Sequence, residues 1–128
     1  MRKQSSTLTE GEQRLMEILW ERKSATVSEV VAALPARHRA AFNTVQTILR
    51  ILETKGHVTH RVEGRAFRYI PLVDREQART SAVKQVLRRF FDGAPAQLAI
   101  NLVDQEKLTD DELATLQRHI EEARRSTK

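Results

Sequence analysis

The spacing of apolar residues predicts three helices in the first part of the chain. Thr9 and Glu12 have the spacing of a capping box, in which each side chain binds the other residue's backbone amide, and an apolar stripe follows at helical intervals. Thr26 and Glu29 repeat this pattern, and Pro35 cannot continue the helix that they begin. The predicted helices span residues 10–22, a short stretch before Pro35, and residues 43–55.

The period of the pattern then changes from 3.6 to 2, which indicates a β-hairpin with its turn at Glu63 and Gly64. One face of this hairpin is apolar and the other is basic. The expected pairs are Val58 with Tyr69, His60 with Phe67 and Val62 with Arg65. Three helices followed by such a hairpin are typical of a winged helix-turn-helix, so the fold class is mainly α with a small β-hairpin wing.

A second helical region follows a boundary at residues 71–74. Helices are expected over about 74–92, 96–103 and 110–125, the last of them after a capping box at Thr109 and Glu112. A unit of this size buries little apolar surface alone, so pairing with a second copy is the expected solution. The sequence therefore predicts a winged-helix domain, 1–73, and a helical dimerisation domain, 74–128. The expected dimer interface contains Val86, Leu87, Phe90, Phe91, Leu98, Leu102, Leu113, Leu116 and Ile120.

The distribution of charge favours nucleic acid as the partner of the first domain. The 128 residues include 22 Lys and Arg against 17 Asp and Glu, a net charge of +5. Residues 1–73 hold 12 basic and 7 acidic residues, which accounts for all of this excess. The absence of cysteine excludes disulfides and thiolate metal sites, and the absence of a long apolar stretch predicts a cytoplasmic protein without membrane insertion.

Residues of the third predicted helix have the side chains that read base edges. Its apolar residues fall at i, i+3, i+4 and i+7, and Asn43, Gln46, Thr47 and Arg50 occupy the opposite face. Asn and Gln can pair with adenine through two hydrogen bonds, Arg can pair with guanine, and a Thr methyl group packs against the methyl group of thymine. Asn43 and Gln46 also have capping-box spacing, so these two residues have a structural alternative.

The remaining basic residues of this region suit phosphate contacts, which position a protein on DNA without reading its sequence. These residues are Arg37, Arg39, Lys55, Arg61, Arg65 and Arg68. His57 and His60 lie at an odd separation in a predicted strand, which sends them to opposite faces and argues against a metal site. No cofactor is expected, and no nucleophile with its base can be assembled, so an enzyme is not predicted.

Several motifs in the same order resemble the BlaI/MecI penicillinase-repressor family between about Leu8 and Ile120. They are LTEGE from Leu8, ATVSEV from Ala25, NTVQT from Asn43, LETKG from Leu52 and EGRAFRY from Glu63. The resemblance implies a homodimeric winged-helix repressor of β-lactamase or related genes that binds a palindromic operator. It also implies that Thr44 and Thr47 approach the operator, and that the C-terminal helices form the dimer interface.

Three departures from the family pattern limit what the resemblance implies. Many relatives carry Arg where this chain has Ile51, so Arg50 would have to substitute for that contact. A membrane sensor protease inactivates β-lactamase-type relatives, and the matching bond is Asn101–Leu102, where relatives have Phe after Asn. The copper-responsive relatives use C-terminal cysteines, which this chain does not have.

Two other functions remain open on the sequence. A winged helix can serve as a protein-interaction module whose basic face binds acidic partners, and such a module would show no salt-dependent binding to duplex DNA. A ligand-gated regulator would need an apolar cavity in the C-terminal region. The repressor function is preferred because the base-reading residue types lie within one basic segment, Arg37–Arg68, which holds seven Lys and Arg residues against two Glu.

Overall fold

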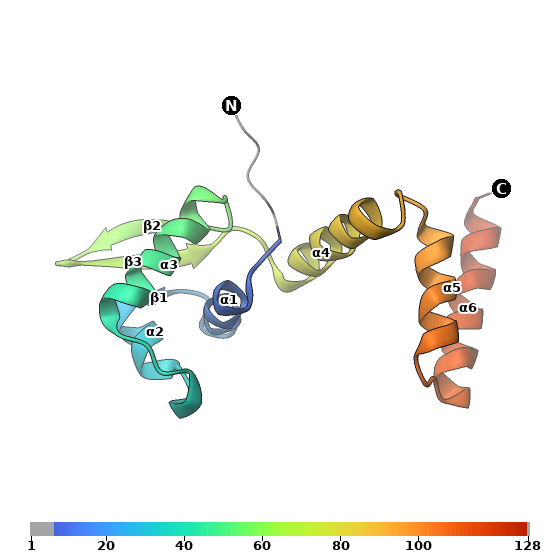
Figure 1. Ribbon diagram of the computed structural model, residues 1–128. Coiled ribbons are helices and arrows are strands. Elements are labelled where there is room, and N and C mark those ends of the chain that lie inside the picture. The colour runs from blue at the N-terminus through green and yellow to red at the C-terminus, as the bar shows by residue number, and fades with distance from the viewer. Residues whose placement is uncertain (1–6, 128) are drawn as a thin grey trace. The chain divides into compact units, whose positions relative to one another are not determined.

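The computed structural model describes residues 7–127, which form two compact units, one ending at Val86 and one starting at Leu87 (Figure 1). The helices and strands of the described residues are α1 (Glu10–Arg22), β1 (Ala25–Thr26), α2 (Val27–Ala33), the 3-10 helix η1 (Ala36–His38), α3 (Phe42–Thr54), β2 (Val58–Glu63), β3 (Ala66–Pro71), α4 (Arg75–Phe90), α5 (Pro95–Gln105) and α6 (Asp110–Ser126). The order of elements is that of a winged helix-turn-helix followed by further helices, as predicted.

The capping boxes begin the helices at the predicted residues. The Glu12 backbone amide donates to Thr9 Oγ1 at 3.1 Å, and the Thr9 amide donates to Glu12 Oε1 at 2.9 Å. Equivalent pairs precede α2 and α6. The α3 helix is different, because Ala41 is its N-terminal cap and provides no side-chain hydrogen bond. The capping-box alternative for Asn43 is therefore wrong, and that side chain lies inside the first turn.

The hairpin forms, but its predicted register is wrong by two residues. The pairs are Val58 with Pro71, His60 with Tyr69, Val62 with Phe67 and Glu63 with Ala66. Gly64 has a φ of +62° and occupies the first central position of the turn, as a type II′ hairpin turn requires. A turn centred on Glu63 and Gly64 would place the glycine second. Since the shift is an even number of residues, each side chain remains on its predicted face.

Strand β1 is an addition that the sequence pattern did not predict. Its two residues pair with β3, Ala25 with Tyr69 and Thr26 with Arg68, so the sheet has the order β1-β3-β2. Two residues are too few to show alternation, and these form a strand because β3 presents a free edge to the chain between α1 and α2. Thr26 thereby joins the sheet and caps α2 at once.

The core of the first unit lies between α1, α2, α3 and the sheet. Its fully buried side chains include Met16, Leu19, Val30, Leu49 and Tyr69. Each of the first three helices buries the apolar stripe seen in its sequence. Burying each such side chain contributes about 1.5–3 kcal/mol, so this core holds α3 firmly against the rest of the unit.

Residues 75–126 form the helices α4, α5 and α6, and none of these residues is buried. Asp74 caps α4, because its side chain accepts from the Gln77 amide at 2.7 Å. The first unit includes α4 as far as Val86, and Arg75 of α4 donates to Glu17 of α1 at 2.6 Å. No helix of residues 7–127 is long and apolar enough to cross a membrane.

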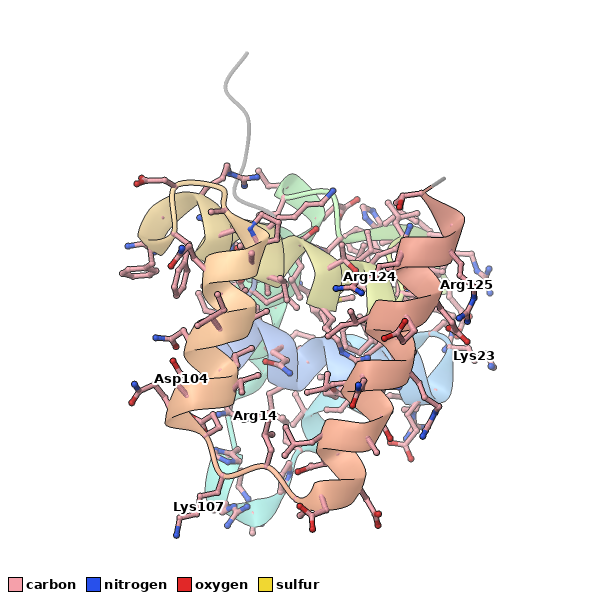
Figure 2. All side chains as sticks on the ribbon, turned by 90° about the vertical axis from the view of Figure 1, so that its right-hand side faces the viewer. Arg14, Lys23, Asp104, Lys107, Arg124 and Arg125 are labelled. Atoms are coloured by element: carbon pink, nitrogen blue, oxygen red, sulfur yellow. The ribbon has the colours of Figure 1, made fainter. Side chains whose placement is uncertain are left out.

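Helices α5 and α6 run in opposite directions within the second unit (Figures 1 and 2). Asp104 and Lys107 lie near the end where the two helices are joined, and Arg124 and Arg125 lie near the other end of α6 (Figure 2). The predicted helices were nearly correct here, since α5 begins at Pro95 and α6 ends at Ser126.

Candidate nucleic-acid interface

Helix α3 presents a polar face on the side opposite its buried stripe. Asn43, Thr44, Thr47 and Arg50 are exposed and Gln46 is half-buried. The Thr47 hydroxyl donates to the Asn43 carbonyl oxygen at 2.9 Å, so its donor is used within the helix and its methyl group is left for apolar contact. The residues predicted to read bases thus share one accessible face on a helix that the core fixes in place.

A groove beside this face joins α3 to the hairpin, which is the wing of the fold. Gln46 and Arg50 line it from α3, and Arg65 lines it from the hairpin turn. Phe42 and Phe67 also line the groove and remain 47% and 38% exposed. Sequence reasoning missed both phenylalanines as interface residues, although Phe67 was placed on the apolar face of the hairpin.

Four of the basic residues predicted to contact phosphate are exposed. Arg61 lies on β2, Arg65 in the turn, and Arg37 and Arg39 lie in and just after η1. The structure thus brings Arg65 together with the α3 face in one groove. The other three are exposed on the same unit without lining that groove.

Lys55 is engaged inside the protein. Its Nζ lies 2.7 Å from Glu12 Oε1, and the two side chains are only 15% and 7% exposed. Nζ also donates to the Thr7 carbonyl oxygen at 3.4 Å. Burial alone would raise the pKa of Glu12, but hydrogen bonds from Lys55 and Thr9 outweigh it and hold that pKa below its ordinary value. The ammonium group of Lys55 is thus engaged in an internal ion pair.

Arg68 is engaged in a similar way. Its guanidinium reaches Glu63 at 2.7 and 3.0 Å and Glu29 at 3.2 Å through two nitrogens, and it donates to Ser24 Oγ at 3.2 Å. Its side chain is 17% exposed. The contact with Glu29 could not be predicted from sequence, because the two residues lie 39 positions apart in the chain.

His60 connects the hairpin to α3. Its Nδ1 lies 2.8 Å from Glu53 Oε1, and its ring lies 4.3 Å from that of Phe67 and 5.5 Å from that of Tyr69. The His60 ring therefore contacts Phe67, although Tyr69 is the residue directly opposite His60 in the sheet. His57 is buried. Within residues 7–127, no three His, Asp or Glu side chains are grouped in a way that could hold a metal ion.

The second unit and the end of α4 expose large apolar side chains. Phe90 is 70% exposed, Ile120 is 54% exposed, and Leu102, Leu113 and Leu116 are each more than 40% exposed. Of the other expected interface residues, Val86 is exposed, whereas Leu87, Phe91 and Leu98 are half-buried. The Asn101–Leu102 bond lies inside α5, so a protease could reach it in extended form only after that helix opens locally.

Comparison with known proteins gives one consistent result. The chain matches the family described as "Penicillinase repressor" over residues 8–122. It is similar to the penicillinase repressor of Bacillus licheniformis, with 27% identity over 121 residues that cover 94% of each chain. It is also similar to the transcriptional regulator BlaI of Mycobacterium tuberculosis, with 33% identity over 113 residues that cover 87% of this chain and 80% of the relative.

A solved structure agrees with these sequence matches. The solution structure of the DNA-binding domain of the repressor BlaI matches with a TM-score of 0.51 and 31% identity, covering 58% of this chain and 90% of that domain. The family match extends well past the winged helix, to within α6. The chain belongs to the penicillinase-repressor family, also called the BlaI/MecI family.

Proposed function

We propose that the protein is a transcriptional repressor that binds operator DNA through α3 and the wing. The observation that carries this proposal is the exposed face of Asn43, Thr44, Thr47 and Arg50 beside a basic wing. Relatives with matches over most of the chain are named as a penicillinase repressor and a transcriptional regulator. The bound protein would repress transcription by excluding RNA polymerase from a promoter. A protein with this function would act in the cytoplasm.

The side chains divide into base readers and phosphate contacts. Arg50 would pair with guanine, and Asn43 and Gln46 with adenine, as α3 enters the major groove. Arg37, Arg39, Arg61 and Arg65 are exposed and would contact phosphates around this helix. Lys55 and Arg68 would instead stabilise the protein, since both already form ion pairs with carboxylates of the protein.

We propose further that two copies associate through their C-terminal helices. The exposed apolar side chains of α5 and α6 support this, because a lone unit would leave Leu102, Leu116 and Ile120 in water. A two-fold dimer carries two α3 helices and would read a palindrome. The two half-sites would lie about one helical turn apart, which is roughly 10 base pairs, or a multiple of that distance.

The regulated genes and the inducing signal are also part of the proposal. By analogy with the penicillinase repressor of Bacillus licheniformis, the targets would be genes of the β-lactamase type. A membrane sensor protease would relieve repression by cutting Asn101–Leu102. Incubation with the activated sensor tests this step by mass spectrometry, and an uncut α5 would refute it.

Selection of bound duplexes from a random DNA pool tests the proposed function. The full-length protein is used at two salt concentrations, and its mass in solution is measured alongside. A palindromic consensus bound by a dimer is the expected result. Binding without a consensus would refute sequence-specific repression, and no binding at all would favour a protein-interaction module.

A further inference from the structure

Arg68 joins three parts of the DNA-binding unit. It lies on β3, and its guanidinium contacts Glu63 next to the hairpin turn, Glu29 in the first turn of α2 and Ser24 before β1. Nε and Nη2 donate to Glu63, both terminal nitrogens donate to Glu29, and Nη1 also donates to Ser24. All three guanidinium nitrogens therefore have partners within the protein.

These contacts leave Arg68 poorly suited to bind phosphate. Two carboxylates balance its single positive charge, and its side chain is only 17% exposed. Hydrogen bonds from the Thr26 amide and from Arg68 hold the pKa of Glu29 below its ordinary value, and Arg68 does the same for Glu63. Both carboxylates therefore stay ionised at neutral pH. A phosphate would have to displace them before it reached the guanidinium.

The outer part of the wing depends on the contact between Arg68 and Glu29. Strand β1 pairs only with Tyr69 and Arg68, so the hairpin beyond this point is a two-stranded ribbon. An isolated two-stranded ribbon is marginally stable in water. Glu29 is itself fixed, because its Oε1 accepts from the Thr26 amide at 3.1 Å in the α2 capping box. Arg68 thus links the end of the ribbon to a rigid point of the helix-turn-helix.

We propose that Arg68 is a positioning residue, which holds the wing against the start of α2 so that Arg61 and Arg65 reach the DNA backbone in a fixed place relative to α3. The part of this inference that concerns DNA binding rests on the proposed function. The contact between the wing and α2 can also be measured without DNA, so the inference and the proposed function can fail separately.

Arg68→Gln in the full-length protein tests the inference, with Arg61→Gln as its matched control. Arg61 pairs with Arg68 across the strands and is exposed. Two quantities are measured: the slope of log affinity against log salt for the selected duplex, and amide hydrogen exchange of residues 58–71 without DNA. Trp20 fluorescence verifies that each variant is folded.

The two variants are expected to differ in both measurements. Arg68→Gln should speed hydrogen exchange in the hairpin and leave the salt slope unchanged. If its wing is in place one-tenth of the time, the duplex binds about tenfold more weakly. Arg61→Gln should lower the salt slope by about one and leave exchange unchanged. A slope reduced by about one in Arg68→Gln, with hairpin exchange unchanged, would make Arg68 a phosphate ligand and overturn the inference.

Glu29→Gln provides a second test that does not alter the arginine. Gln at this position preserves the capping box and removes the negative charge. Faster hairpin exchange and weaker binding are expected, because Arg68 loses one partner. Stronger binding with a steeper salt slope would mean that Glu29 restrains a phosphate-binding Arg68, and would contradict the inference. If no duplex is bound by the wild type, the exchange data still decide whether Arg68 holds the wing.

Discussion

The Lys55→Met variant separates an ion pair within the protein from a contact with DNA. Lys55 Nζ lies 2.7 Å from Glu12 Oε1, and the side chains are 15% and 7% exposed. Removing one partner of a fully buried pair costs about 3–5 kcal/mol. Because water reaches part of Lys55, we expect a smaller loss of about 2 kcal/mol in the free energy of unfolding.

This loss is large enough to measure directly. In a domain of 60–100 residues, 1 kcal/mol shifts the melting temperature by about 4–8 °C, so a decrease of about 8–16 °C is expected. Urea unfolding followed by Trp20 fluorescence reports on the same unit, because the Trp20 Nε1 donates to the Val73 carbonyl oxygen at 2.8 Å. Lys84→Met is the matched control, since Lys84 is exposed on α4.

The pH dependence gives a second measure of the same pair. The pKa of Glu12 lies below its ordinary value of 4.5 in the folded protein, so the pair stabilises the fold above that pH and the stabilisation is lost as the pH falls below it. In Lys55→Met the ammonium no longer lowers this pKa, so the pKa of Glu12 lies higher than in the wild type. The difference in stability between wild type and variant should therefore shrink in acid.

DNA binding provides the refutation. The salt slope of Lys55→Met should equal that of the wild type, because its charge is not available to phosphate. If the variant unfolds at the same urea concentration as Lys84→Met and its salt slope falls by about one, then Lys55 contacts phosphate and the internal pair is not formed.

Three further variants test the remaining parts of the account. Arg50→Ala should reduce discrimination at one base position by about 1–3 kcal/mol in competition binding, and equal losses on all sequences would exclude base reading. Leu49→Ala removes a fully buried side chain and should lower the free energy of unfolding in urea by about 2–5 kcal/mol. Leu116→Asp should shift the mass in solution from dimer to monomer while leaving Trp20 fluorescence unchanged, and an unchanged dimer would place the interface elsewhere.

The helices of this protein follow from local sequence. Thr9 with Glu12 and Thr26 with Glu29 place helix starts to the residue, because a capping box needs only neighbouring side chains. The face of α3 followed in the same way from the spacing of its apolar residues. The hairpin register was less determined, since Gly64 fits either central position of a two-residue turn. With the glycine second, Glu63 would need a positive φ as well, and the observed turn avoids this.

The roles of individual cations could not be predicted from the sequence. Lys55 and Arg68 have the same charge as Arg61 and Arg65, and all four fall within one basic segment. Lys55 and Arg68 differ from the other two because the fold brings carboxylates to them, Glu12 from 43 residues away and Glu29 from 39 residues away. Strand β1 was missed for a related reason, because β3 rather than local propensity makes it a strand.

The ratio of affinities for the selected palindrome and for a scrambled duplex of the same composition tests the central claim most directly. Both are measured with the full-length protein at one salt concentration near physiological strength. A specific repressor should bind the palindrome at least about 10³ times more tightly. Equal affinities for the two duplexes would contradict the claim that α3 reads an operator.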